Sequence, residues 1–470
     1  MLVLAVAGLI MAISFLGMVH LGDLRGHIAP FLGLNGLAWV GYALAIWWLP
    51  LRLPQWGRRR NALVLIAGFG LLFRLIVLLT TPPTLSDDVY RYIWDGRLAN
   101  AGVSPYSYAV GSRQLDRLDS PERARVNHQS MASPYLPVAQ ALFALVYRVA
   151  PDNPGAFQVA AVVFDLLTSC LIIDLLRRLR RPPAWALVYL WNPLAIVEFA
   201  HGAHVDAWML FLMMAAFWFW IAARSRGLSV LALAAASLTK GIPILVAAVL
   251  GRRWGKVYTA ACILLAVVAC VSFAARAGWG LAGPLDGTGV FGALRIYAQE
   301  WNYNGGLYHW LEVAITGYRT AGAVPPEIVG WEPISKAKWI VSIALGVVLL
   351  AIWRSGHSGL GDLDLLRLAL VPLGAYLLLT TTVHPWYLTL ILPFLPFLPS
   401  RPGSNRNPGR FLWPWLYLSA AISLSYLTYL DPANLREYAA VRLSEYLPFY
   451  ALLIWAAWPA ISGARQLERG

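Results

Sequence analysis

The 470-residue sequence has few charged residues and few cysteines, and both shortages limit what the protein can be. Only 13% of its residues are Asp, Glu, Lys or Arg, about half the share in an ordinary soluble protein, whereas 59% are apolar. Such a chain cannot cover a water-facing surface, so we expect it to lie in a lipid bilayer. Cys170, Cys262 and Cys270 lie in apolar runs without CxxC spacing, which indicates packing residues rather than disulfides or a zinc site.

Three features are also missing: the first two argue against a nucleotide-binding membrane enzyme, and the third argues against a transporter. There is no Gly-rich phosphate-binding motif, and no cytoplasmic loop is long enough to hold a nucleotide-binding domain. There is no internal repeat of the kind that many transporters carry. The chain therefore reads as a single membrane domain over residues 1–470.

Apolar runs of membrane-crossing length recur along the chain and predict an all-α, polytopic transmembrane bundle of about 12–14 spans. The run over 228–250 differs from the others because Lys240, Gly241 and Pro243 interrupt it and arginines flank both ends. We expect a broken helical hairpin that enters and leaves on one side of the membrane.

The net charge of +14 is explained by topology rather than by a nucleic-acid partner. Arginine clusters fall at every second connection, which places those connections and both termini in the cytoplasm. The predicted location is the inner (plasma) membrane, with any chemistry on the extracytoplasmic, periplasmic face. Two long external loops follow from this orientation, at 81–154 and 276–336.

The first loop opens with a segment rich in acids and aromatic residues, Thr84 to Arg97. Ser86 is a plausible N-cap and Gly102 a plausible stop, which predicts a short external juxtamembrane helix. Asp87 and Asp88 would lie at its N-terminus, where the helix dipole favours an ionised carboxylate able to act as a base on a hydroxyl. Helical spacing places one stripe of side chains together: Tyr90, Trp94 and Arg97. The alternative is a helix cap with an interfacial aromatic belt.

A second motif lies at the end of the span predicted over 183–200 and contains an acid and two histidines. Glu198 and His201 share a helical face, and an acid inside a span is a candidate functional residue. His201, His204 and Asp206 have the spacing HxxHxD, which is a weak metal-site signal. A second carboxylate, Asp206, facing Asp87 is the interpretation we favour.

Charged residues within apolar runs form a third group of candidates. Lys240 adjoins a helix break, a geometry that presents a cation and free N–H groups to an anion. Arg74 lies near the external end of the third span, where snorkelling to the interface explains it equally well. Asp165 is in mid-span and is expected to neutralise Lys240 or Arg74.

Two external turns complete the candidate site. One holds Trp301, Asn302 and Asn304, and aromatic faces next to amides bind sugars by stacking and hydrogen bonding, although belt residues look the same. The other holds His384 and Tyr387, at the start of a span within reach of a lipid phosphate.

These segments together resemble the GT-C superfamily of integral-membrane glycosyltransferases. The similarity is greatest to bacterial polyprenyl-phosphate-mannose-dependent mannosyltransferases and the GPI mannosyltransferase group. The matching stretches run in order over about residues 80–390 and include Ser86–Arg97, Ser133–Gln140, Asn192–Ala207, Leu238–Pro243, Trp301–Gly305 and His384–Tyr387. The long loop follows the third span here, whereas many family members place it after the first.

The resemblance implies a catalytic base at Asp87 or Asp88 and a second functional acid at Asp206. It implies an inverting transfer of a hexose, mannose in the nearest group, from a polyprenyl-phosphate donor to a glycan, glycolipid or protein acceptor of the cell envelope. Residues expected to bind substrates are Arg91, Trp94, Arg97, Glu198, His201, His204, Lys240, Trp301, Asn302, Asn304, His384 and Tyr387. No cofactor is required by this chemistry, although a divalent cation could assist.

Two other functions compete with a transferase. A transporter or flippase of lipid-linked saccharides would suit the many crossings and the broken helix at Lys240. A metal-dependent lipid hydrolase would use the histidines and Asp206. Net movement of intact lipid without a glycoside product, or activity abolished by a chelator, would distinguish these from a carboxylate-based transfer.

Overall fold

A computed structural model describes residues 1–56, 60–80, 82–276, 288–289, 292–316, 335–355, 359–399, 408–431 and 435–467. This part of the chain is helical and has no strand, only isolated bridges from Tyr303 and Asn304 to Thr382. The predicted all-α class is confirmed. About half of the predicted external loop over 276–336, and most of the connection over 400–410 that is predicted to be cytoplasmic, lies outside the described residues.

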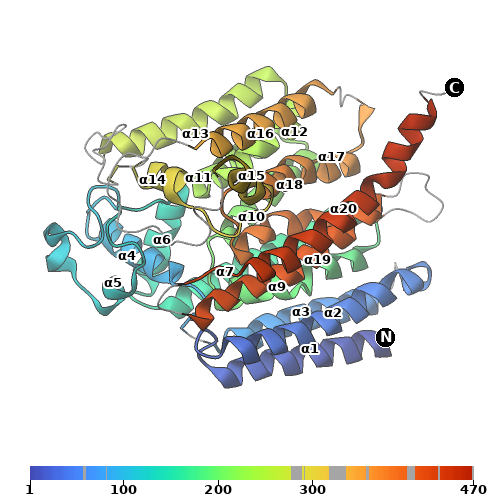
Figure 1. Ribbon diagram of the computed structural model, residues 1–470, viewed down its shortest axis with the longest axis horizontal. Helices are drawn as coiled ribbons and strands as arrows, with labels where there is room; N and C mark the ends of the chain where they lie inside the picture. The colour runs from blue at the N-terminus through green and yellow to red at the C-terminus, as the bar shows by residue number, and fades with distance from the viewer. Residues whose placement is uncertain are drawn as a thin grey trace.

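Three helices at the N-terminus form one side of the bundle, drawn in blue in Figure 1. They are α1 (Leu2–Leu21), α2 (Ile28–Trp56) and α3 (Arg60–Val77). Glycines let these helices approach closely, as is common in membranes. A Cβ added at Gly8 would lie 2.7 Å from the Phe69 ring of α3, and one at Gly41 would lie 2.9 Å from the carbonyl oxygen of Ala7.

Short elements gather at one end of the bundle, on the left of Figure 1, whereas the start of α1 and the end of α20 (Ala439–Leu467) lie toward the other end. They are α4 (Asp88–Asn100), η1 (Arg113–Leu118), α5 (Pro121–Arg125) and α6 (Pro137–Val149). The predicted external helix is therefore present, and it stops before Gly102, whose φ is +74°. It begins one residue later than predicted: Asp87 is the N-cap, and Ser86 Oγ accepts a hydrogen bond from the N–H of Asp88.

The centre of the bundle is built from α7 (Pro154–Arg178), α10 (Asp206–Ile221) and α11 (Arg226–Thr239). Between α7 and α10, where the sequence predicts one continuous span over 183–200, the backbone is broken because prolines recur in the segment. Its pieces are η2 (Pro183–Ala186), α8 (Leu187–Leu190), α9 (Pro193–Ile196) and η3 (Val197–His201), the last a π-helical turn. These pieces are buried, so other helices cover the interrupted backbone.

The second half of the chain surrounds this centre. Its elements are η4 (Ile242–Val246), α12 (Ala247–Trp254), α13 (Lys256–Arg276), α14 (Gly292–Glu300), α15 (Leu307–Thr316), α16 (Lys336–Arg354), α17 (Asp362–Leu368), α18 (Leu370–Leu379), η6 (Pro385–Phe397), η7 (Pro408–Phe411), α19 (Leu412–Ala421), η8 (Ile422–Leu430) and α20. The buried 3₁₀ helix η6 contains Pro393 and Pro396, which remove the hydrogen bonds of a regular α-helix.

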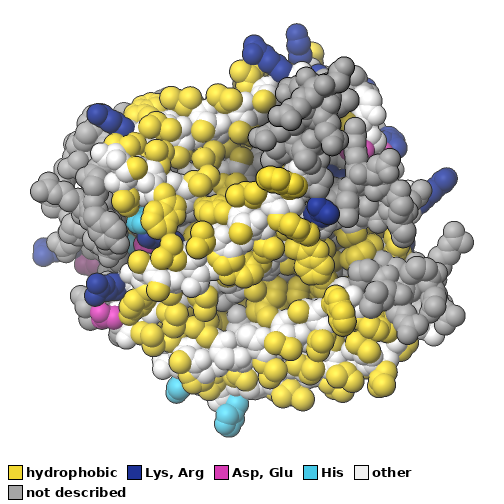
Figure 2. All heavy atoms as spheres, turned by 45° about the vertical axis from the view of Figure 1, so that its right-hand side comes forward, with side chains coloured by type: hydrophobic (Ala, Val, Ile, Leu, Met, Phe, Trp, Pro, Cys, Tyr) yellow, Lys and Arg dark blue, Asp and Glu magenta, His cyan; other side chains and the backbone are white. Residues whose placement is uncertain are grey.

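Five helices in the described part are long and apolar enough to cross a membrane, and five shorter apolar helices accompany them. Together with the absence of strands there, this confirms a polytopic membrane protein. Figure 2 shows hydrophobic side chains covering the middle of the visible face, with Lys and Arg mainly toward its edges. The predicted crossing between α7 and α10 is not among these ten helices, because its backbone is interrupted.

Candidate functional site

A cavity of about 800 Å³ lies where α4 meets the bundle. Its walls come from the α1–α2 turn, the start of α4, the break after α11, the segment before α15, the start of η6, and η8. Segments far apart in sequence therefore meet at this one place. Eight of the predicted site residues line the cavity: Asp87, Asp88, Arg91, Lys240, Trp301, Asn302, His384 and Tyr387.

The two neighbouring aspartates have different environments. Asp87 is about one-third exposed, and its Oδ2 pairs with Arg25 Nη1 at 3.0 Å. Its other oxygen makes no hydrogen bond within the described residues. Asp88 is more enclosed: Oδ1 accepts from the Asn127 amide at 3.4 Å and Oδ2 from the Tyr135 hydroxyl at 3.5 Å. Asp87 thus lines the cavity and keeps one oxygen free of hydrogen bonds among the described residues, whereas both oxygens of Asp88 accept hydrogen bonds.

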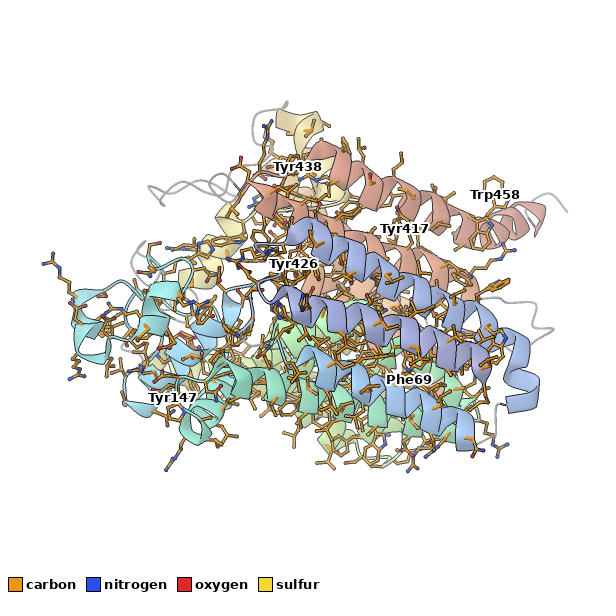
Figure 3. The ribbon with its side chains drawn as sticks, turned by 90° about the horizontal axis from the view of Figure 1, so that it is seen from below. Phe69, Tyr147, Tyr417, Tyr426, Tyr438 and Trp458 are labelled. Atoms are coloured by element: carbon orange, nitrogen blue, oxygen red, sulfur yellow. The ribbon has the colours of Figure 1, made fainter. Side chains whose placement is uncertain are left out.

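His204 lies behind Asp88, fully buried, between two carboxylates. Its Nδ1 is 3.6 Å from Asp88 Oδ2, and its Nε2 is 3.4 Å from Glu198 Oε2. The Tyr426 hydroxyl donates to both oxygens of Glu198, at 2.9 and 3.1 Å. Figure 3 shows Tyr426 toward the end of the bundle that carries the short helices. His204 and Glu198 do not line the cavity, so they act on it through Asp88.

These contacts explain why the pKa values of His204 and Asp88 are shifted. Burial alone would lower the pKa of His204, but hydrogen bonding and charge from Asp88 and Glu198 raise it to about 9. Burial alone would raise the pKa of Asp88, but the neighbouring His204 lowers it to about 2. At neutral pH the imidazole is therefore a cation between anions.

Asp206 pairs with Lys240 instead of facing Asp87 across the cavity. The Lys240 ammonium donates to both carboxylate oxygens, at 2.9 and 3.1 Å, and lies 4.3 Å from the centre of the Tyr387 ring. Asp165, the other predicted partner of Lys240, is buried against Arg74 and Tyr189. The prediction that Asp165 neutralises Arg74 is thereby confirmed. Lys240 is the cation at the helix break that lines the cavity, as the sequence indicated.

Aromatic side chains make up much of the remaining wall. The rings of Tyr303, His384 and Trp386 form a stack, with centroid distances of 4.7 and 4.4 Å. Trp386 stacks in turn on His204, at 4.1 Å. Burial lowers the pKa of His384 to about 3, so it is neutral at physiological pH and is not the cation that we predicted for a phosphate.

Arg91 lines the cavity, but its guanidinium donates to backbone carbonyls of Asn127, His128 and Met131. It therefore fixes the loop that carries Asn127. His128 from the same loop meets the Trp301 ring edge-on, at 4.4 Å.

Besides Glu198 and His204, four predicted substrate-binding residues lie outside the cavity lining. Trp94 is buried beneath Arg123, and Arg97 pairs with Asp152 at 2.6 Å. His201 bonds Thr80 and the N–H of Thr84, and Asn304 donates to Glu445 at 2.6 Å. Each side chain has protein partners that explain its position, so we assign these four to the support of the site.

Several lining residues were missed by the sequence analysis. Arg25 belongs to the turn between the first two helices, 62 residues from its partner Asp87. Others come from the C-terminal part of the chain: Tyr426, Tyr429 and Glu437. Aromatic residues near a span end were the available signal for the two tyrosines, but nothing local marks Arg25 or Glu437.

The HxxHxD residues do not converge. His201, His204 and Asp206 each have a separate set of partners, given above. Within the described residues, no three or more His, Cys, Asp or Glu side chains are grouped so that they could hold a metal ion.

Fold and site together define a polytopic helical membrane protein with a carboxylate-bearing, aromatic-lined cavity at one end of the bundle. A sequence model of the family "Alpha-(1->6)-mannopyranosyltransferase, N-terminal domain" matches residues 4–256, more than half of the chain. The chain therefore belongs to this family, which agrees with the resemblance to bacterial mannosyltransferases.

Two named relatives are similar to it. Alpha-(1->6)-mannopyranosyltransferase A of Corynebacterium glutamicum is 25% identical over 215 residues, which cover 40% of this chain and 43% of the relative. A probable alpha-(1->6)-mannopyranosyltransferase of Mycolicibacterium smegmatis is 25% identical over 429 residues, 77% of this chain and 70% of the relative. The alignment with the first relative thus spans less than half of that protein's length. No solved structure matches the chain.

Proposed function

We propose that this protein transfers a mannosyl residue from a polyprenyl-phosphate donor to an acceptor hydroxyl, at the extracytoplasmic face of the plasma membrane. The observation that carries the proposal is the free carboxylate oxygen of Asp87, which faces a cavity that also presents the Lys240 ammonium. The family match and the printed names of the two relatives support mannose as the sugar.

The chemistry needs one base and one cation. Asp87 takes the proton of the acceptor hydroxyl while that oxygen forms a bond to the anomeric carbon of the sugar. The bond from the anomeric carbon to the phosphate oxygen breaks, and its electron pair leaves with the polyprenyl phosphate. Attack from the side opposite the phosphate inverts the anomeric configuration. Lys240 stabilises the negative charge that grows on the leaving phosphate, in a cavity whose lining is mostly apolar.

Asp87 fits the role of base better than Asp88. A base must offer a free oxygen to the hydroxyl, and both oxygens of Asp88 already accept hydrogen bonds. The lowered pKa of Asp88, about 2, also makes it a weak proton acceptor. Arg25 leaves one oxygen of Asp87 open and fixes the other.

The cavity end of the bundle is the extracytoplasmic end in this proposal, because the basic connections lie on the cytoplasmic side. The test uses a variant without the three native cysteines. Arg113→Cys, in exposed η1, is expected to react with an impermeant thiol reagent in intact cells, and Arg226→Cys only after lysis. The reverse pattern would overturn the orientation.

The activity test compares the purified wild type with Asp87→Asn and Asp88→Asn, using polyprenyl-phosphate mannose and a panel of glycan and glycolipid acceptors. We expect kcat to fall by about 10²–10⁴-fold in Asp87→Asn and by less in Asp88→Asn. Equal rates for wild type and Asp87→Asn would refute the base assignment. Movement of intact donor lipid across liposomes without a mannoside product would favour a flippase instead.

A further inference from the structure

The segment between α9 and α10 has an unusual backbone and a buried histidine that the transfer chemistry alone does not require. Its π-helical turn η3 carries Glu198, and the following turn carries His204. π-Helical turns are rare and often occur at functional sites. The turn continues through Ala203, which adopts the left-handed conformation at φ +57°, an unusual one for a residue with a Cβ. The backbone here thus adopts an energetically unfavourable conformation, which positions the His204 ring.

The His204 ring is fully buried, and Trp386, Gly202 and two carboxylates pack against it. Trp386 covers one face, with an interplanar angle of 15° and a centroid distance of 4.1 Å. Gly202 passes so close that an added Cβ would lie 2.7 Å from His204 Cδ2. The two ring nitrogens point to Asp88 and Glu198, which belong to separate parts of the fold. A side chain that is fully buried in this way is not available to bind substrate.

We infer that His204 is a positioning residue: as an imidazolium it clamps Asp88 to Glu198 and so holds the first turn of α4, with Asp87 at its start, against the cavity. Asp88 anchors the turn and Asp87 performs the chemistry. Glu198 anchors the opposite end, because the Tyr426 hydroxyl holds both of its oxygens. This inference rests on the proposed function for its kinetic part and on the geometry alone for its stability part.

Because the clamp depends on the positive charge of His204, its contribution to stability should depend on pH. The titratable or charged groups near the ring are Asp88, Glu198, His201, His384 and Lys240, with Tyr426 bound to Glu198. The raised pKa of His204, about 9 against about 6.5 in an unfolded chain, means that the clamp stabilises the fold fully below pH 6.5. The stabilisation is lost as pH rises through 9.

The test measures both thermal stability in detergent and kcat as functions of pH for wild type, Glu198→Gln and His204→Gln. In wild type, both quantities are expected to fall as pH rises toward and through 9. Glu198→Gln removes one of the two carboxylates, so its decline should move to lower pH. His204→Gln should lose the decline and show kcat about 10- to 100-fold below wild type at pH 7, with KM for donor and acceptor within about threefold. The exposed His20→Gln is the matched control and should behave as wild type.

The outcomes separate the clamp from the proposed function. A wild type that transfers no mannose, but whose stability profile shifts in Glu198→Gln as described, would refute the proposed function and retain the clamp. An alkaline decline of stability or kcat at the same pH in all three proteins would overturn the clamp. A purely structural histidine would lower stability in His204→Gln without changing the pH dependence of the enzyme that survives.

Discussion

The Lys240 ammonium lies 2.9 Å from Asp206 Oδ1, and this pair joins the break after α11 to the start of α10. Asp206 is almost fully buried, whereas Lys240 reaches the cavity and retains about one-fifth of its side-chain exposure. The Asp206 carboxylate therefore orients the Lys240 ammonium, which remains accessible to an anion in the cavity. Asp206 and His204 come from the same short turn, so this turn supports both the cation and the α4 aspartates.

Removing only the Asp206 carboxylate should destabilise the protein more than removing both charges of the Asp206–Lys240 pair. We expect Asp206→Asn to lower the thermal midpoint, because it leaves a largely buried ammonium without a counter-ion, at a cost of about 3 kcal/mol. The double variant Asp206→Asn/Lys240→Met should recover much of that stability. Its kcat should nevertheless stay about 10²–10³-fold below wild type, because the cation at the phosphate is gone. Recovery of activity in the double variant would contradict the role given to Lys240.

Arg25 is expected to act through Asp87. It contacts Asp87 at 3.0 Å and stacks on the Tyr429 ring at 4.7 Å, so its loss frees the carboxylate to rotate. Arg25→Gln should reduce kcat about tenfold and change KM little, and Arg25→Lys should restore part of the loss. Arg113→Gln, on exposed η1, serves as the control. Steady-state kinetics at saturating donor measure both effects, and a change confined to KM would argue against this positioning role.

The fold was predictable where local composition decides it. Apolar runs predicted the membrane bundle, and the Asp-Asp start with the Gly102 stop predicted α4 to within one residue. The broken segment before α10 was predicted as one span, because hydropathy counts apolar residues and is blind to the hydrogen bonds that prolines remove. Helices distant in sequence cover that interrupted backbone, and local composition does not show such tertiary packing.

The site was predictable to the extent that its residues lie at span ends. The sequence placed Asp87, Asp88 and His384 on one face of the membrane and Lys240 at the break of a predicted hairpin, and all four line the cavity. The pairings between them were not predictable, since a carboxylate in sequence gives no sign of which distant cation it meets. Arg25 was missed for the same reason.

The buried histidines should make the protein acid-sensitive. Burial lowers the pKa of His201 to about 4 and that of His384 to about 3, whereas an unfolded histidine titrates near 6.5. Between these values the unfolded chain binds more protons than the folded one, so stability should fall as pH drops below about 6.5. Thermal midpoints in detergent between pH 4 and 7 measure the slope. His201→Gln should flatten it, and His20→Gln should not; equal slopes in all three proteins would exclude His201 as a cause.

The approach of Gly202 to the His204 ring gives a test that leaves every charged group in place. An added Cβ at Gly202 would lie 2.7 Å from both His204 Cδ2 and the Glu198 carbonyl oxygen, so the ring must shift away from its carboxylates. Gly202→Ala should therefore cost about 1–3 kcal/mol of stability and reduce kcat in the same way as His204→Gln.

Gly227→Ala is the matched control for this substitution. Its Cβ would meet nothing within 4 Å, near the start of α11, and alanine favours a helix by up to about 1 kcal/mol over glycine. We expect unchanged kcat and equal or higher stability for this variant. Gly202→Ala could instead retain both the wild-type alkaline decline and the wild-type kcat. That result would contradict the close packing at Gly202 and the conclusion that the position of His204 between Asp88 and Glu198 sets the activity.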